Sequence, residues 1–467
     1  MQQDATNTAD PGRDSARGSG TTDGPDQALL RAISEALAAH DLDRARQLAG
    51  DLKAPDLADV IELLEPDARV ELIQALGTSL DFEVLSELDP AVRDQLSEAL
   101  PNELLARAVG ELETDDAAYV IESLEAADQA EILAQLPRDE RAALERNLDY
   151  PEGTAGRLMQ ADFVAVAPFW SVGQVIDYMR ESADLPDSFT EIFVVDPAYK
   201  VLGSLDLSRV LRSRRDVQIE AIMDPDRHVM LATDDQAKVA RQFQRYDLVS
   251  APVVDANQRL VGIVTIDDVV DVIQDEAEEE IKALGGVGHE SVSDTVGAVL
   301  PRRFAWLFVN MLTALLASWV ISWFNASLQQ MVALAVLMPI VASMGGNAGT
   351  QTMTVSVRAL ATHELGAFNL ARFVFRETAV GLLNGLLFAV IMGVVVMIWY
   401  KASRLGVVIG LAMICNLVAA ALAGIYIPLG LQRWGYDPAV SSTVFVTTVT
   451  DVVGFFAFLE LASILLL

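Results

Sequence analysis

The sequence predicts a multidomain membrane protein: an α-helical repeat domain, a tandem pair of small α/β domains, an acidic connecting helix and a five-helix transmembrane domain. The first observation behind this class is a mean hydropathy of +0.32 beside a pI near 4.3. The second is that residues 301–467 contain five acidic and eight basic residues, whereas residues 1–300 contain the other 61 acidic and 25 basic residues. Apolar and acidic character therefore occupy different parts of the chain. The third is that the acidic part contains internal repeats.

The acidic part begins with a leader and a helical repeat. Residues 1–26 are rich in Asp, Thr and Gly and lack the apolar core of a cleaved signal, so we expect a disordered leader on the cytoplasmic side. Residues 27–150 read as short amphipathic helices, and the segment that begins at Ala58, ADVIELLEPDARVEL, returns at Ala118 as AYVIESLEAADQAEI. A helix pair that recurs along the chain in this way is typical of a small helical solenoid.

A second duplication follows. The segment that begins at Val194, VVDPAYKVLGSLDL, aligns with the segment that begins at Val253, VVDANQRLVGIVTI. Each contains a β-branched strand, an Asp-centred turn, a second strand and the start of a helix. This pattern resembles a tandem pair of CBS domains, which we expect at residues 151–215 and 216–275. An acidic connecting helix is expected at residues 276–301.

Five apolar stretches within residues 302–467 are long enough to span a membrane. They are Phe304 to Phe324, Met331 to Val355, Thr378 to Tyr400, Gly406 to Leu429 and Ser442 to Leu465.

The basic residues predict how these spans are oriented. One side of the predicted membrane carries Arg302, Arg303, Arg358, Arg372, Arg376 and Arg433. The other side carries only Lys401 and Arg404. The positive-inside rule therefore predicts a multi-pass protein of the cell (inner) membrane whose N-terminal domains are cytoplasmic, and an odd number of spans puts the C-terminus outside.

Charge and cysteine content limit which binding partners and which covalent or metal cross-links the sequence allows. The acidic half repels nucleic acid and attracts cations, so we expect divalent cations and the lipid bilayer as partners and no nucleic acid. The chain has one cysteine, Cys415, which excludes a disulfide framework or a cysteine metal cluster within it.

Asp451 is the most informative single residue. It lies within the apolar stretch of residues 442–467, where a carboxylate is costly unless it faces protein, a partner or a water-filled path. Thr447 and Thr443 precede it at helical spacing on the same face. Mg²⁺ is usually held by one or two carboxylates with several waters retained, which suits one aspartate per chain. The alternative is an ion pair of Asp451 with a cytoplasmic-side arginine: Arg358, Arg372 or Arg376.

The second span contains a glycine-rich segment, PIVASMGGNAGTQT, which begins at Pro339. Proline and glycine leave backbone carbonyls free or closely approachable, and irregular backbone at membrane depth is tolerated only where protein or water covers it. The alternative is that Gly345 and Gly349 form a helix-packing motif. Asn347 and Gln351 favour a pathway, because packing alone does not require them.

The order of domains, together with the motifs GGNAGTQ and TTVTDVVGF, resembles the MgtE family of magnesium channels or transporters over nearly the whole chain after residue 25. The resemblance implies a homodimer whose pore follows the two-fold axis. Asp451 of both subunits would hold hydrated Mg²⁺, with the Thr447 backbone one turn away and Asn347 lining the path. Thr443 takes the place of another small polar group in this pattern.

The resemblance also implies that intracellular Mg²⁺ closes the pore by binding the acidic cytosolic domains. The implied sensor residues are Asp247, Asp268, Asp271, Glu276, Glu279, Glu280 and, on the helical domain, Asp115. Tyr119 stands where the pattern has an acid, which puts one sensor site in doubt. Clustered carboxylates repel one another until divalent cations screen them, so a cation that binds only the closed state shifts the population towards it. The alternative is a solvated acidic helix.

A nucleotide site is a further candidate. Thr265 and Asp268 fit the G-h-x-[ST]-x-x-D pattern with which CBS domains hold ribose and phosphate, whereas the first repeat has Arg209 in place of the final acid. Adenine nucleotide, such as ATP, is therefore a tentative second ligand beside Mg²⁺.

The sequence thus predicts a Mg²⁺-selective channel or transporter that mediates Mg²⁺ uptake, and not an enzyme. An intramembrane aspartyl protease would need two carboxylates that share a proton, and Glu377 and Glu460 both lie towards span ends. Two alternatives stay open: transport of Co²⁺, Mn²⁺ or Ni²⁺, and a membrane-anchored Mg²⁺ or nucleotide sensor without transport. The absence of His and Cys from the proposed path favours a hard ion.

Overall fold

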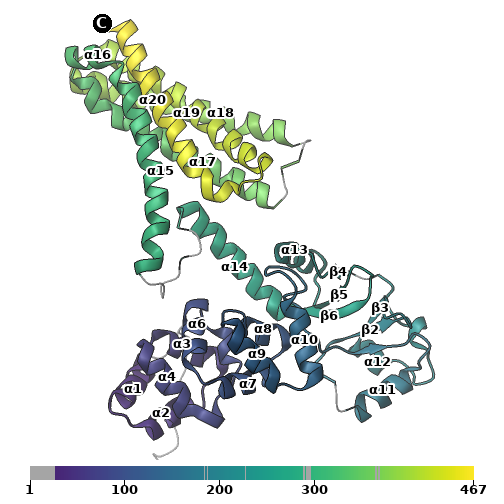
Figure 1. Cartoon of the computed structure of the whole chain (residues 1–467). Coiled ribbons are helices and arrows are strands. Elements are labelled where there is room, and N and C mark those ends of the chain that lie inside the picture. Colours follow the sequence, from purple (N-terminus) through teal and green to yellow (C-terminus); the bar gives the residue numbers. More distant parts are fainter. Residues whose placement is uncertain are drawn as a thin grey trace, which may run out of the picture. The chain divides into compact units, whose positions relative to one another are not determined.

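The computed structural model describes residues 27–466 except 183, 184, 187, 227, 288, 289, 291–295, 363, 364, 367 and 368. The predicted leader, residues 1–26, lies outside the described residues. The chain divides into two compact units, one ending at Ile273 and the other beginning at Gln274 (Figure 1).

The first unit begins with ten α-helices that bury their apolar stripes in one core containing Ile33, Ile61, Leu72, Leu105 and Ile121. The helices are α1 (Gln27–Ala38), α2 (Leu42–Ala49), α3 (Ala54–Leu63), α4 (Pro66–Leu76), α5 (Val84–Glu87), α6 (Pro90–Ala99), α7 (Asn102–Glu111), α8 (Thr114–Ile121), α9 (Ala126–Gln135) and α10 (Arg138–Leu148), with a 3-10 turn at Gly77–Ser79. The pair α3–α4 recurs as the pair α8–α9, as the sequence repeat predicts.

A side chain from the following helix caps the C-terminal end of α3 and, in the second copy, of α8. Arg69 of α4 donates to the carbonyls of Ile61, Glu62 and Leu64 at the end of α3, at 2.9 to 3.1 Å. Gln129 of α9, the equivalent position in the second copy, donates to the three matching carbonyls at the end of α8. These bonds satisfy carbonyls that a helix end leaves without an intrahelical partner.

Two α/β domains of the same topology follow. The first has β1 (Ala165–Val166), α11 (Val172–Glu181), β2 (Glu191–Val195), β3 (Val201–Asp206) and α12 (Leu207–Arg212); a 3-10 turn at Ile219–Ala221 precedes the second, which has β4 (Met230–Leu231), α13 (Gln236–Tyr246), β5 (Ser250–Val254), β6 (Leu260–Thr265) and α14 (Ile266–Gly285). Each sheet has three strands, the first pair parallel and the second antiparallel. This confirms the predicted tandem α/β fold.

The duplication extends to individual hydrogen bonds. Asp196 accepts from the backbone N–H groups of the second and fourth residues after it, and Asp255, its equivalent in the second domain, does the same. The third residue after each has a left-handed backbone: Tyr199 at φ +64° and Gln258 at φ +63°. The Asp-centred turn predicted in both repeats is therefore one turn built twice.

The connecting helix α14 follows β6 directly and ends at Gly285. It crosses the predicted boundary between residues 275 and 276. Residues 296–301 belong to the next helix, α15.

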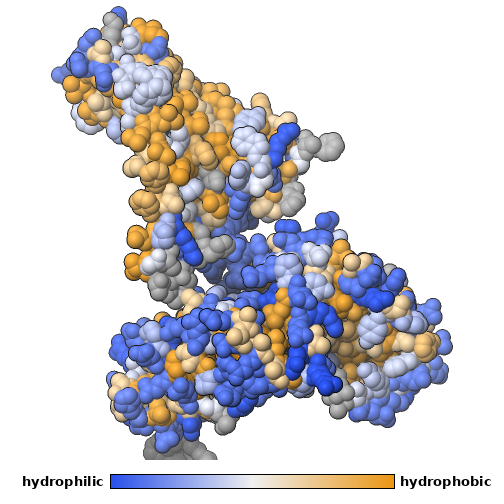
Figure 2. Space-filling view, viewed as in Figure 1, coloured by the Kyte–Doolittle hydropathy of each residue, from blue (hydrophilic) through white to orange (hydrophobic). Residues whose placement is uncertain are grey.

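The second unit contains α15 (Val296–Ser322), α16 (Asn325–Gln330), α17 (Ala333–Ala361), α18 (Leu370–Tyr400), α19 (Ser403–Arg433) and α20 (Pro438–Leu465). Five of these described helices are long and apolar enough to cross a membrane: α15, α17, α18, α19 and α20. Figure 2 shows apolar side chains spread over their outer surface. The third span begins at Leu370 rather than at the predicted Thr378, so Arg372 and Arg376 lie inside α18.

Helix α19 is the central helix of this bundle, and glycines let its neighbours approach it closely. A Cβ on Gly381 of α18 would lie 2.9 Å from the Leu417 carbonyl oxygen of α19. A Cβ on Gly424 of α19 would lie 2.9 Å from the Gly349 carbonyl oxygen of α17. Small residues at such crossings are the usual means of packing helices within lipid.

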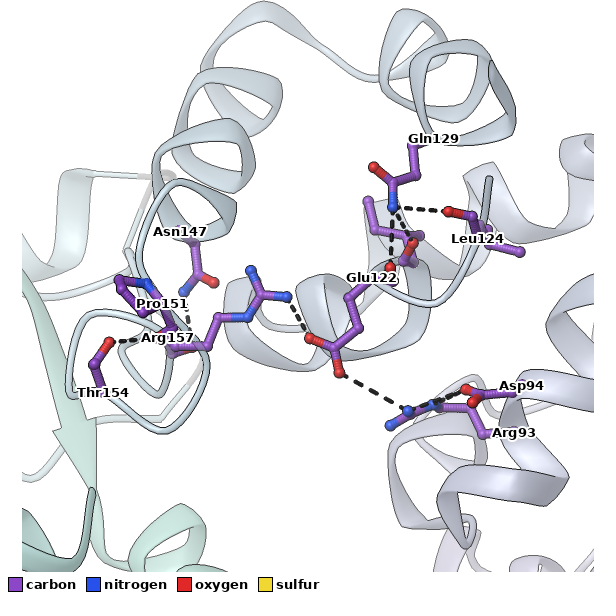
Figure 3. A network of polar contacts seen from close by, with 10 residues as sticks. Arg93, Asp94, Glu122, Leu124, Gln129, Asn147, Pro151, Thr154 and Arg157 are labelled. Carbon is purple, nitrogen blue, oxygen red and sulfur yellow. Dashed lines mark hydrogen bonds and ion pairs between the residues drawn. The ribbon is translucent and has the colours of Figure 1, made fainter. Parts of the chain in front are cut away.

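Within the first unit, one buried charge network joins the helical domain to the start of the α/β pair (Figure 3). Glu122, directly after α8, accepts a hydrogen bond from Arg157 and lies 3.9 Å from Arg93 Nη2. Arg93 also contacts Asp94 at 3.2 Å. The side chains of Arg93 and Arg157 are only 4% and 13% exposed, so water solvates them poorly. Glu122 therefore provides the negative charge that stabilises both guanidinium groups.

We predict that Glu122→Ala lowers the thermal midpoint of the first unit by roughly 5–10 °C, because it leaves two buried guanidinium groups short of a partner, at about 3 kcal/mol. Differential scanning calorimetry of the purified chain measures this midpoint. The control is Glu111→Ala, which breaks a surface pair with Arg107 and should change stability by less than about 0.5 kcal/mol. Equal midpoints for the two variants would contradict the assignment.

Candidate ion pathway and cation-sensing site

Asp451 lies on a face of α20 that its own chain covers only in part. Its side chain is half-buried and Thr447, one turn earlier, is exposed. Asp451 has no hydrogen bond or ion pair to any of the described residues, whereas Arg376 pairs with Glu377 at 2.8 Å. The alternative ion pair with an arginine is therefore not formed within the described part of this chain.

Helix α17 packs antiparallel to α20 and brings its glycine-rich segment to the level of Asp451. A Cβ on Gly349 would lie 2.6 Å from Val446 Cγ1 and 3.4 Å from Thr450 Cγ2. A Cβ on Gly345 would contact the side chain of Asn416, which also lies against Gly454 of α20. Asn347 lies between the two glycines and is exposed.

The packing alternative for this segment is observed, the expected irregular backbone is not formed, and the ion pathway stays a prediction. Helix α17 is continuous through Pro339, and Gly345 and Gly349 pack against neighbouring helices, as the packing motif predicts. Asn347 and Gln351 instead remain exposed on the surface of the single chain. Exposed amides at membrane depth need water or protein as partners.

Thr443 contacts the end of the connecting helix. Its hydroxyl donates to the Leu284 carbonyl of α14 at 3.3 Å and lies 3.8 Å from Met353 Sδ of α17. Next to it, Ala283 joins an apolar cluster that includes Val446. One end of the α17–α20 face is thus in contact with α14.

In the first unit, carboxylates from α8 and α14 lie near one another. Asp115 is 9% exposed, and its Oδ1 has no hydrogen-bond partner within the described residues. Burial, followed by the charges of Asp268, Asp116 and Glu113, raises the pKa of Asp115 well above its usual value. A buried oxygen with no donor is a place for a cation or a proton.

The neighbouring acids show the same effect. Burial and nearby carboxylates raise the pKa of Glu113 and of Asp268 to about 7 and that of Asp116 to about 6, although Thr265 donates to Asp268 at 2.6 Å. Burial, and then Asp271, raises the pKa of Glu87.

The structure brings only some of the predicted sensor residues together. Asp115 and Asp268 interact, and the pKa of Asp271 is raised by burial and by Asp267. Asp247 is exposed and ends α13 in a left-handed conformation. The remaining three, Glu276, Glu279 and Glu280, lie on the part of α14 that belongs to the second unit.

Sequence reasoning missed Glu87, Glu113 and Asp116. Glu113 and Asp116 flank Asp115 at the start of α8, a signal that could have been used, but Glu87 comes from α5 and joins them only through tertiary packing. These acids do not form a finished metal cage, since no three Asp, Glu, His or Cys side chains of the described residues are arranged to hold an ion directly.

Tyr119, the departure from the expected acid, forms part of a cationic contact. The guanidinium of Arg93 lies 3.4 Å from the centre of the Tyr119 ring. This arrangement is a cation–π contact with a buried arginine. A fixed cation thus lies at the position where the family pattern expects a second carboxylate.

Beside the acid cluster is a cavity of about 1510 Å³ lined by residues of the helical domain and of both α/β domains. It contains Thr265, Tyr199 and Arg259, and also Glu113 and Asp267. The Thr265 hydroxyl is already engaged with Asp268. The cavity is large enough for a nucleotide, but its carboxylates repel phosphate.

Comparisons with known proteins agree with this layout. A family model described as a divalent cation transporter, MgtE, matches residues 338–461; the MgtE intracellular N domain matches residues 52–153, and a CBS domain matches residues 219–275. The solved cytosolic domain of the Mg²⁺ channel MgtE in complex with ATP is 31% identical with a TM-score of 0.48, covering 52% of this chain and 99% of that one.

Two whole-length relatives are named magnesium transporter MgtE. That of Thermus thermophilus is 33% identical over 94% of this chain and 99% of the relative, and that of Bacillus subtilis is 27% identical over 90% and 93%. Since the cytosolic and membrane domains match in the same order along nearly the entire sequence, this chain belongs to the MgtE family of divalent cation transporters.

Proposed function

We propose that this chain transports Mg²⁺ into the cell as a homodimer of the inner or plasma membrane, along a path lined by α17 and α20, and that intracellular Mg²⁺ closes it. The observation that carries the proposal is Asp451, a half-buried carboxylate on an apolar helix with no partner among the described residues. The MgtE relatives named as magnesium transporters support the choice of ion.

The chemistry of the face supports a hydrated, hard cation. Asp451 offers charge, and Asn347 and Gln351 offer amide oxygen, whereas the Thr447 carbonyl already accepts a hydrogen bond from the Thr450 hydroxyl at 2.9 Å. Mg²⁺ holds its water shell tightly and needs few direct protein ligands, so carboxylate and amide oxygens at the path surface suffice. Co²⁺, Mn²⁺ and Ni²⁺ are the rival ions, and competition in the same uptake assay ranks them.

A second copy of the chain is the proposed cover for this face. Asp451 and the exposed amides would otherwise meet acyl chains, at a cost of a few kcal/mol for the charge alone. Two copies related by a two-fold axis would place both aspartates around one aqueous path.

Closure by Mg²⁺ follows from the acid cluster on α8 and α14. Asp115 and Asp268 are held close together while burial and mutual repulsion oppose their ionisation. Divalent cations, with retained water bridging to the carboxylates, would stabilise this arrangement and leave it unfavourable when Mg²⁺ is scarce. Near the other end of the same helix, the Leu284 carbonyl bonds to Thr443 of α20, so α14 is the proposed gate element.

Adenine nucleotide remains a hypothesis for this chain. The cavity beside Thr265 supports it, whereas the engagement of Thr265 with Asp268 and the replacement of the first repeat's acid by Arg209 do not. The rival function without transport, a membrane-anchored sensor, predicts no ion uptake by the reconstituted chain. A sensor without transport does not explain why polar amides are exposed on the apolar helix α17.

Asp451→Asn should reduce Mg²⁺ uptake into proteoliposomes by about ten- to a hundredfold, because a charge-assisted ligand contributes about 1.5–3 kcal/mol. Glu460→Gln, which removes another acid from α20, is the matched control and should transport like the parent. Parental uptake by Asp451→Asn would remove the pore assignment.

Neutralising Asp268, Asp271, Glu276, Glu279 and Glu280 together should raise the internal Mg²⁺ needed for half-closure by at least about tenfold, since the closed state loses its preferential affinity for the ion. Flux measured against stepped internal Mg²⁺ tests this.

The control removes the same amount of charge from exposed acids of the helical domain that lie outside the proposed sensor, and its closure should match that of the parent. The five control positions are Glu35, Glu98, Glu103, Glu125 and Glu145. A sensor variant that closes at the parental Mg²⁺ concentration would argue against the sensing role.

Stability of the first unit in chelator should fall as pH rises from about 4 to about 7. The pKa of Asp and Glu in an unfolded chain is about 4, whereas the pKa of Asp268 and of Glu113 in the folded chain is about 7. The folded state therefore binds more protons in this window, so raising the pH removes stability.

Thermal midpoints measured across this pH range, with and without excess Mg²⁺, test the prediction. Mg²⁺ should flatten the fall, and Asp115→Asn with Asp268→Asn should flatten it in chelator. A midpoint that rises with pH in chelator would show that these carboxylates are not destabilising.

A further inference from the structure

Asn416 lies where three membrane helices meet. It is in the middle of α19, its side chain is 0% exposed, and its Nδ2 donates a 2.8 Å hydrogen bond to the Val341 carbonyl of α17. Its Oδ1 has no hydrogen-bond partner among the residues that the structure describes. A buried amide with one unpaired group is unfavourable in an apolar bundle, so its presence requires a reason other than packing.

The amide fills a slot made by two glycines on different helices. A Cβ on Gly345 of α17 would lie 2.1 Å from Asn416 Nδ2, and a Cβ on Gly454 of α20 would lie 2.6 Å from the same atom. Neither position can carry a side chain without displacing the amide. Asn416 therefore fixes how closely both helices approach α19 at this level.

This slot adjoins the polar residues of the proposed path. Gly454 lies about one helical turn after Asp451 on α20, and Gly345 lies just before Asn347 on α17. We infer that Asn416 is a positioning residue for ion selection: by bonding to α17 and filling the gap to α20, it sets the separation of Asp451 and Asn347. The inference rests on the proposed pore.

Selection among hydrated divalent cations depends on this separation. Mg²⁺ accepts less variation in its ligand distances than larger ions do, so a small change in helix spacing alters its passage more than theirs. A side chain that only filled space could be replaced by an apolar group of the same volume without any such change. The two roles therefore predict different ion preferences.

The test uses the full-length chain in proteoliposomes, with Mg²⁺, Co²⁺ and Mn²⁺ uptake measured separately. Asn416→Leu keeps a side chain of similar size and loses the donor, and it should change the Mg²⁺-to-Mn²⁺ rate ratio by about three- to tenfold, because Mn²⁺ is the larger ion. The matched control is Ile409→Ala, a fully buried position earlier on α19, which should leave the ratio unchanged even if protein yield falls.

A second pair of variants tests the geometry. Gly454→Ala should shift the ratio in the parent, because its Cβ strikes the amide, and should shift it less in the Asn416→Ala background. If Asn416→Leu elutes as aggregate, Asn416→Ala, which also removes the donor, serves as the ratio test.

The inference is overturned if Asn416→Leu, or Asn416→Ala in its place, keeps the parental ratio while Asp451→Asn abolishes uptake. Parental uptake by Asp451→Asn is a different result, because it removes the proposed pore itself. A changed ratio in the Asn416 variant, with an inactive Asp451→Asn, supports both proposals.

Discussion

Negative charge without a matching cation from the protein is the constraint on which both units depend. In the first unit, Asp115 and Asp268 are kept close and largely out of water. In the second, Asp451 lies on an apolar helix with no partner among the described residues. In the proposed function, a small divalent cation would balance the charge at both places, because it carries two positive charges and brings its own water to the carboxylate oxygens.

The two situations differ in how much protein surrounds the charge. Asp115 is 9% exposed, so an ion bound in the proposed sensor would change the stability of the first unit. Asp451 is only half-buried, which suits an ion that must leave as easily as it arrives. In the proposed function, the same carboxylate chemistry would serve retention of the ion in one place and its passage in the other.

The features that the sequence predicts well are periodic or local: the apolar stretches, the helical repeat and the paired Asp-centred turns can each be recognised within one segment. Helix bounds were less accurate where charges occur inside a helix, as with Arg372 and Arg376 of α18, because a hydropathy pattern stops at the first arginine.

The features that could not be predicted come from tertiary packing. Glu87 reaches the acid cluster from a different helix, and Arg93 reaches Tyr119 in the same way. Asn416 reads as one polar residue in a long apolar run, and only the positions of Gly345 and Gly454 show what it contacts. No spacing rule within a single segment connects these residues.

The glycines of the membrane bundle are best understood together with that asparagine. A glycine on α17 or α20 alone would permit close packing, as the crossing of Gly424 with the Gly349 backbone does. Two glycines that leave room for one amide achieve something different, because the amide then determines the distance that the glycines permit. Replacing flexible apolar contacts with one directional hydrogen bond gives a bundle that can hold its polar face at a fixed width, and a fixed width is what a path for one kind of hydrated ion requires.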